Sequence, residues 1–324
     1  MRKAFLFGVL GSVVACAAIA CQGTEDRPPI SEGPGGGHGG GGSGSSDAGG
    51  GSGGDAGATT FATFTGYDVT GLAADGDTLY VTLAPLDTTQ AGKVDRVAAD
   101  GTVTDLVTTA VSPSLPTLYA GTLFYSDVKS GVLSTIEAVD LTATAPITPQ
   151  DVVPNVQSPG AILDVDGLLF YSFVSGGVAV WSTPVGDGGA GSDVASYPGD
   201  YVPAGMASDG ANVYFTASAA GASQILRVPA VGGAAESIWP GTSAGTLGNV
   251  VLSGGVLYFT VSVTGNGGGL YGVPVAGDGT STITIANGLD TPSGLAATTT
   301  SLYFTTATAT NGGLWRIGYD APDS

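Results

Sequence analysis

The stretch "GGVLYFTVSV", from Gly254 to Val263, decides the fold because closely similar stretches return along the chain. One of them is "ANVYFTASA" from Ala211, and another is "TSLYFTTAT" from Thr300. Six copies occur at intervals of 44 to 46 residues, and their central aromatic residues are Tyr80, Phe124, Phe170, Tyr214, Tyr258 and Tyr303. A repeat of this length is typical of the four-stranded blades of a propeller.

Each copy stands within the same series of parts. A short strand of small residues comes first, as in "GLAAD" from Gly71 and "GMASD" from Gly205, and an Asp-Gly turn often follows it. Asp-Gly between two apolar runs is a strong hairpin signal, because both residues tolerate a positive φ. The "LYF" strand is next and is apolar on both faces, as a strand packed between two neighbouring sheets must be. A third strand and, in most units, a fourth complete the blade.

The two ends of the repeat region predict a closed ring. The sixth unit stops after its third strand, at Tyr319, whereas the segment from Thr60 to Thr65 precedes the first unit as an unpaired fourth strand. We therefore expect this strand to complete the last blade, which removes the exposed edges of an open array. The prediction is an all-β domain over residues 59–319, a six-bladed β-propeller of four-stranded blades, with a short tail at 320–324.

The first 20 residues have the layout of a secretory signal. Arg2 and Lys3 precede an uncharged apolar run that ends at Ala20,. Small residues stand before Cys16 and before Cys21, and both sites resemble the lipobox at which bacterial lipoproteins are cleaved and acylated. We favour Cys21, because polar chain begins directly after it; cleavage at Cys16 and an ordinary cleaved signal are the alternatives. More than one acyl chain gives stable anchoring, so this resemblance implies a lipid-anchored protein of the bacterial cell envelope, with Gln22 favouring the outer membrane.

Residues 21–58 connect the predicted anchor to the domain. The tract "GPGGGHGGGGSGSSDAGGGSGGDAGA" within them cannot bury enough apolar surface to fold, so we expect a flexible tether,. His38, the one histidine of the chain, lies inside this tract and has no partners with which to complete a metal site,.

The repeats resemble the six-bladed propellers of the NHL-like and TolB-like kind, especially those found as bacterial lipoproteins. The residues that carry this resemblance are "SPGAILDVDGLLFYS" from Ser158, "VPAGMASDGANVYFT" from Val202 and "TPSGLAATTTSLYFT" from Thr291. The resemblance implies a fold and no single activity. Calcium-dependent lactonases of similar architecture place Glu, Asn and Asp on the inner strands. Here the inner strands offer only Asp164 and Asn249, too few for a calcium cage,.

Composition excludes several classes of function. The chain has 27 acidic and 8 basic side chains, and this charge repels nucleic acid, so we expect no nucleic-acid partner,. The domain contains neither His nor Cys, which excludes Ser-His-Asp and Cys-His catalysis and removes the usual zinc ligands,. We expect no metal and no cofactor, and a monomer.

Polar loop residues remain as candidates for a binding face over the central channel. They are Tyr67, Asp68, Asp87, Gln90, Asp127, Lys129, Asn155, Asp200, Tyr201, Asn266, Asp290 and Asn311. The strongest for ligand binding are Tyr67, Asp68, Asp200, Tyr201 and Asp290, although Asp and Asn also favour turns for purely structural reasons.

We expect a non-enzymatic docking platform for a protein or glycan. The alternative is a carbohydrate-active hydrolase or lyase that uses carboxylates on the channel face. A purely structural role is a third possibility.

Overall fold

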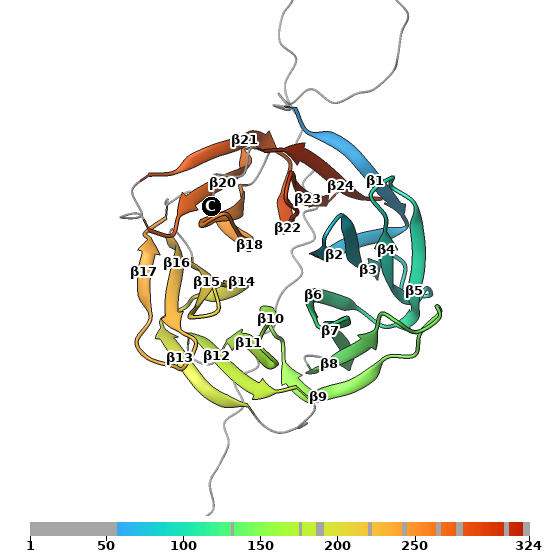
Figure 1. Cartoon of the computed structure of the whole chain (residues 1–324), viewed down its shortest axis with the longest axis horizontal. Helices are drawn as coiled ribbons and strands as arrows, with labels where there is room; N and C mark the ends of the chain where they lie inside the picture. Colours follow the sequence, from blue (N-terminus) through green and yellow to red (C-terminus); the bar gives the residue numbers. More distant parts are fainter. Residues whose placement is uncertain are drawn as a thin grey trace, which may run out of the picture. The chain divides into compact units, whose positions relative to one another are not determined.

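The protein is seen here in a computed structural model that describes residues 57–319, apart from 131–132, 175–176, 186–190, 220–221, 242–244, 264–266, 277–280 and 308–310. Six sheets of four antiparallel strands are arranged around a central axis, which confirms the predicted propeller (Figure 1). The predicted signal, Cys21 and the glycine-rich tether lie outside the described residues. Within the described part of the chain, no helix is long and apolar enough to cross a membrane.

The first three blades follow one another along the chain. Blade I consists of β2 (Tyr67–Asp75), β3 (Thr78–Pro85), β4 (Gly92–Val97) and β5 (Val103–Ala110). Blade II consists of β6 (Pro113–Tyr119), β7 (Thr122–Ser130), β8 (Leu133–Asp140) and β9 (Gln150–Gln157). Blade III consists of β10 (Ala161–Val165), β11 (Leu168–Val174), β12 (Gly177–Pro184) and β13 (Ser192–Pro198).

The second half of the ring repeats the pattern. Blade IV consists of β14 (Val202–Ser208), β15 (Asn212–Ala219), β16 (Ala222–Pro229) and β17 (Glu236–Trp239). Blade V consists of β18 (Thr246–Ser253), β19 (Val256–Ser262), β20 (Gly268–Pro274) and β21 (Ile283–Leu289). Blade VI consists of β22 (Pro292–Ala297), β23 (Ser301–Ala307), β24 (Asn311–Gly318) and β1 (Thr59–Thr65).

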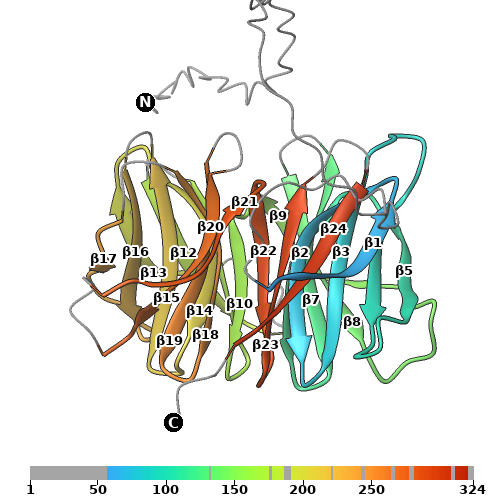
Figure 2. The ribbon, with the colours of Figure 1, turned by 90° about the horizontal axis from the view of Figure 1, so that it is seen from above.

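The N-terminal strand closes the ring as predicted. β1 pairs antiparallel with β24, from Thr59 opposite Arg316 to Thr65 opposite Asn311. Figure 2 shows the two strands side by side at the outside of blade VI. The first and last strands of the domain therefore belong to one sheet.

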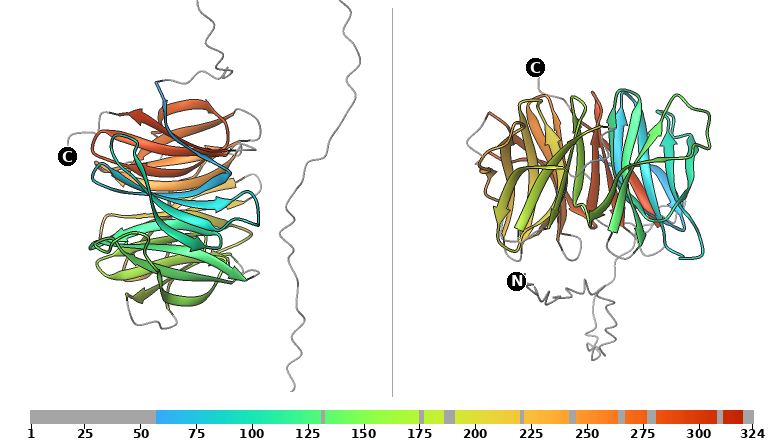
Figure 3. Two further views of the ribbon diagram at one scale, coloured as in Figure 1. Left: turned by 90° about the vertical axis from the view of Figure 1, so that its right-hand side faces the viewer. Right: turned by 90° about the horizontal axis from the view of Figure 1, so that it is seen from below.

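The first strand of every blade is the innermost one (Figure 1). Each of these strands has a partner strand on one side only, so its free backbone edge faces the axis. The chain passes from the outermost strand of one blade to the innermost strand of the next on one face of the ring, seen edge-on in Figure 3. We call this side the crossover face.

The hydrophobic core lies between neighbouring blades. The "LYF" strands are almost wholly buried, and the central aromatic residues Phe124, Phe170 and Tyr214 have at most 1% of their surface exposed. One cluster joins Leu79 and Val81 of blade I to neighbouring side chains of blade VI. The apolar side chains on both faces of these strands are therefore explained by packing against two sheets.

Candidate functional site

The structure places the five predicted binding residues on one face but at three separate connections. Tyr67 and Asp68 begin β2, whereas Asp200 and Tyr201 lie between β13 and β14. Asp290 lies between β21 and β22. All three connections belong to the crossover face.

The blade IV residues form a local cluster of their own. The amide of Gln224 donates to the Tyr201 hydroxyl at 3.0 Å, and its oxygen accepts from the Tyr197 hydroxyl at 3.4 Å. The two tyrosine rings meet edge to face with centroids 5.3 Å apart. Asp200 is exposed beside this cluster. The polar atoms of these side chains are thus engaged with one another, as expected for a structural role of Tyr201.

A cavity of about 280 Å³ lies along the channel and is lined by the six inner strands. The residues that line it carry mostly apolar side chains, Leu72, Ile162 and Met206 among them. Of the described residues that line it, Asn249 carries the one amide or carboxyl side chain. The carboxylates that the enzyme alternative requires are therefore not on the wall of this cavity.

The side chains of the inner strands do not make a donor set that fits a calcium ion. Asn249 accepts the Val250 N–H at 2.9 Å and donates to the Leu295 carbonyl at 3.3 Å. Asp164 accepts the Gly167 N–H at 3.1 Å beside the hairpin turn, away from the cavity. The described residues contain no group of three or more His, Cys, Asp or Glu side chains suited to a metal. Calcium takes six to eight oxygen ligands, and this donor set does not supply them.

A polar cluster lies on the side of blade I that faces blade VI. We call it the seam cluster, and it consists of Tyr67, Lys93, Asp95 and Asp105. Asp95 and Asp105 stand directly opposite each other on β4 and β5. Lys93 pairs with Asp105 at 3.2 Å, and its ammonium lies 5.5 Å from the centre of the Tyr67 ring. Asp95 stands opposite Val81, whose side chain belongs to the core shared with blade VI.

The two carboxyl groups of the seam cluster differ sharply in exposure. Asp95 is 3% exposed, and its Oδ1 is buried without a hydrogen-bond partner. The side chain of Asp105 is 50% exposed. Burial, with the charge of Asp105 as a second cause, raises the pKa of Asp95 to about 7 from its ordinary value of 3.8,. The pair therefore combines a buried carboxyl of raised pKa with a half-exposed one, and at a pair of carboxyl groups in unlike environments one group can donate a proton while the other accepts,.

Asp68 also has a perturbed pKa. Burial raises the pKa of its carboxyl, while a hydrogen bond from the Val69 backbone acts in the opposite direction. It follows Tyr67 in the sequence, so two of the predicted binding residues begin the strand that borders the seam cluster.

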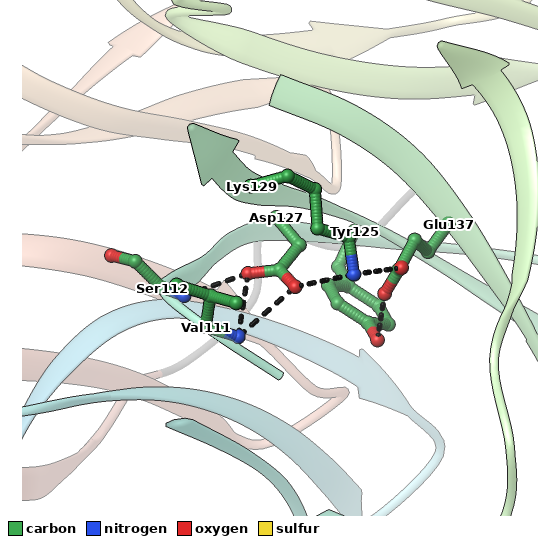
Figure 4. A network of polar contacts seen from close by, with 6 residues as sticks. All are labelled: Val111, Ser112, Tyr125, Asp127, Lys129 and Glu137. Carbon is green, nitrogen blue, oxygen red and sulfur yellow. Dashed lines mark hydrogen bonds and ion pairs between the residues drawn. The ribbon is translucent and has the colours of Figure 1, made fainter. Parts of the chain in front are cut away.

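Blade II contains a second ionic network (Figure 4). Lys129 lies 2.9 Å from Asp127 and 2.5 Å from Glu137, two carboxylates that are almost wholly buried. Glu137 also accepts a hydrogen bond from the Tyr125 hydroxyl. Asp127 accepts hydrogen bonds from the backbone N–H groups of Val111 and Ser112 at 2.7 to 3.0 Å. These bonds fix the backbone of the connection between blade I and blade II. Burial is the first cause that raises the pKa of Tyr125, and the Glu137 bond is the second.

Asp127 and Lys129 were among the candidates from sequence, whereas Asp95, Asp105 and Glu137 were not. These three residues lie within strands, and loop position was the criterion that selected candidates. The signal available in the sequence was an acidic residue inside the third strand of the repeat, as in "KVDRV" from Lys93 and "STIEAV" from Ser134.

No protein-family model and no curated protein matches this chain at a significant level. Solved propellers do match its structure. A gluconolactonase from Xanthomonas campestris has a TM-score of 0.56 at 16% identity, over 81% of this chain and 88% of its own. A protein from Agrobacterium tumefaciens described as calcium-binding regucalcin has a TM-score of 0.58 at 16% identity, over 83% and 97%. A chain of a nidogen/laminin complex has a TM-score of 0.56 at 18% identity, over 71% and 85%. At these identities the likeness establishes the fold, a propeller with neighbours of the NHL-like kind.

These neighbours correct the expectation of a non-enzymatic docking platform. They include two proteins described as gluconolactonases and a luciferin-regenerating enzyme, at TM-scores of 0.54 to 0.56. The expectation rested on finding no catalytic signature in the inner strands and loops. The Asp95–Asp105 pair of blade I lies in neither place. The descriptions of these neighbours agree better with the enzyme alternative than with a docking platform.

Proposed function

We propose that this chain is a carbohydrate-active hydrolase whose carboxyl pair is Asp95 and Asp105. The observation that carries the proposal is the seam cluster itself, in which a buried carboxyl lacking a partner for Oδ1 stands opposite a half-exposed one. The propeller enzymes of similar architecture support the same class of function. The difference from the sequence-based alternative is the place, because the pair lies on outer strands of blade I instead of around the channel.

The different solvent exposure of the two carboxyl groups assigns their roles. Asp105 is the group that solvent and a substrate can reach, so it is the catalytic residue that activates water as a general base,. Asp95, whose carboxyl has a raised pKa, carries the proton of the pair and passes it on through Asp105. Hydrolysis of a sugar lactone illustrates the balance. Water adds to the carbonyl carbon, the ring C–O bond breaks, the proton from the pair goes to the departing oxygen, and the proton of water returns to the pair.

The net charge of the chain restricts the class of substrate that can bind. A formal net charge of −19 repels polyanionic sugars such as uronate polymers, and both reacting groups are acidic,. We therefore propose neutral sugar lactones or esters as the substrate class. Tyr67, beside Lys93, supplies an aromatic face of the kind on which a sugar ring can stack.

The test is a hydrolysis assay on the purified full-length chain with a panel of neutral sugar lactones and chromogenic sugar esters. Asp105→Asn should lower kcat by about 10²- to 10⁴-fold, the usual contribution of one acid–base group. The matched control is Asp151→Asn, because Asp151 occupies the same position in blade II opposite Glu137 and is exposed. Turnover by Asp105→Asn at the wild-type rate, or no turnover of any panel member by wild type, would contradict the proposal.

A further inference from the structure

Blades I and II carry an acidic pair at the same position of their sheets. In blade I, Asp95 stands opposite the residue that follows the central Tyr80, and its partner on the fourth strand is Asp105. In blade II, Glu137 stands opposite the residue that follows the central Phe124, and its partner is Asp151. The two blades thus place acidic residues identically and differ in what surrounds them.

The lysine contacts a different member of each pair. In blade II, Lys129 and the Tyr125 hydroxyl both bind the inner acid Glu137, so the charge of the buried group is met by two donors (Figure 4). In blade I, Lys93 binds the outer acid Asp105 at 3.2 Å, and the inner acid Asp95 keeps a buried oxygen without a partner. Val81 replaces the tyrosine, so the phenol is missing as well.

Few other titratable groups face Asp95. Lys93 on its own strand and Asp105 on β5 are the charged groups that act on it. Tyr67 on β2 lies beyond Lys93. From blade VI, Tyr303 packs into the shared core, and Arg316 lies over the Phe61 ring with its guanidinium 5.5 Å from the ring centre. Among these groups, Lys93 is the cation whose charge opposes protonation of Asp95.

We propose that Lys93 is the positioning residue of the pair: it holds Asp105 as the charged member and leaves Asp95 as the member that carries the proton. The consequence for catalysis rests on the proposed function, whereas the consequence for proton binding does not. In blade II the lysine serves the opposite arrangement, because it neutralises the buried acid directly. Whether the lysine contacts the outer or the inner acid therefore decides whether the inner acid carries a proton or forms an ion pair.

The experiment is a pH titration of the Asp95 and Asp105 carboxyl carbons by ¹³C NMR in the full-length chain, with the signals assigned from Asp95→Asn and Asp105→Asn. Lys93→Met should raise the titration midpoint of Asp105 more than that of Asp95, because Lys93 contacts Asp105 directly and an opposite charge nearby favours the ionised carboxylate; Lys93→Arg should restore both midpoints,. Asp105→Asn should lower the midpoint of Asp95, and it reports on the same pair if Lys93→Met does not fold. Arg227→Met, which removes the cation that pairs with Glu236 across the third and fourth strands of blade IV, should leave both midpoints unchanged.

Midpoints of Asp95 and Asp105 that shift equally in Lys93→Met, or that shift as much in Arg227→Met, would overturn the role of Lys93. The kinetic arm is separate. Lys93→Met should lower kcat/KM by about 10- to 100-fold, the size of effect that misplacing a catalytic group produces, and should displace the pH–rate profile in the direction of the titration. A wild-type chain without hydrolase activity would overturn the proposed function, while the titration alone would still decide what Lys93 does.

Discussion

Substituting Asp95 by Asn should make the protein more stable at alkaline pH and leave it nearly unchanged in acid. The pKa of Asp95 is raised from 3.8 to about 7 in the folded chain. A carboxyl raised in this way contributes stability that is fully present below about 3.8. That contribution is lost as the pH rises through about 7, because the folded protein must then bury a charge that the unfolded chain exposes.

The magnitude follows from the width of that window. One pH unit corresponds to about 1.4 kcal/mol, so the interval from 3.8 to about 7 corresponds to about 4 kcal/mol of unfolding free energy. Asp95 is 3% exposed, so solvent screening removes little of this. Asn is nearly the same size and carries no charge at any pH, so the variant should gain most of this amount relative to wild type above pH 8.

The assay is urea denaturation followed by the fluorescence of Trp181, Trp239 and Trp315 at several values between pH 4.5 and 8.5. Subtracting the unfolding free energy of wild type from that of Asp95→Asn at each pH cancels the contributions of the other acidic groups, which both proteins share. Asp151→Asn is the control and should track wild type. Parallel curves for wild type and Asp95→Asn across the whole range would show that the buried carboxyl does not titrate as argued, and the reasoning would fail.

Three further outcomes follow from the packing and the ion pairs. Lys129→Met leaves Asp127 and Glu137 without their cation and should lower the unfolding free energy by about 2 kcal/mol, as measured by urea denaturation,. This is less than the roughly 3–5 kcal/mol lost when a wholly buried pair is broken, because the side chain of Lys129 is 41% exposed,. Gly160→Ala would place a Cβ 2.4 Å from the Pro203 carbonyl oxygen and should lower Tm through a loss of about 1–3 kcal/mol, and an unchanged Tm would contradict the close packing of blades III and IV,. Deleting residues 59–65 removes the partner of β24, so light scattering should detect aggregation through the exposed edge, whereas a monomeric variant as stable as wild type would show that closure is dispensable,.

The fold could be predicted from sequence because it repeats one short pattern. The "LYF" strands are apolar on both faces, which requires a sheet on either side, and the six copies fix the number of blades. The unpaired strand near Thr60 gave the closure, since it matched the fourth-strand position that the last unit lacks. Turn chemistry was equally informative: Asp166 and Gly167 both adopt positive φ, 52° and 81°, as an Asp-Gly hairpin predicts.

The site could not be predicted in the same way, because it depends on pairing between strands. Asp95 and Asp105 are ten positions apart, and their meeting depends on a register that contains two irregularities near Val94. Asp95 also stands opposite Val81, whose side chain packs into the core shared with blade VI. Loop residues such as Asp200 and Asp290 stood out in the sequence because of their residue type, but they lie in separate connections between blades.

Closure by the first strand has a consequence for the order of events during synthesis. Within the domain, β1 is made first and its partner β24 last, and Thr59 and Arg316 are 257 positions apart in the sequence. At translation rates of about 5–20 residues per second, β1 waits roughly ten to fifty seconds before a partner exists. Until then the nascent ring is an open arc with two unsatisfied sheet edges. The last strand of the domain to be made, β24, therefore decides when the domain becomes resistant to proteases, and pulse-labelled chains should acquire that resistance in one late step.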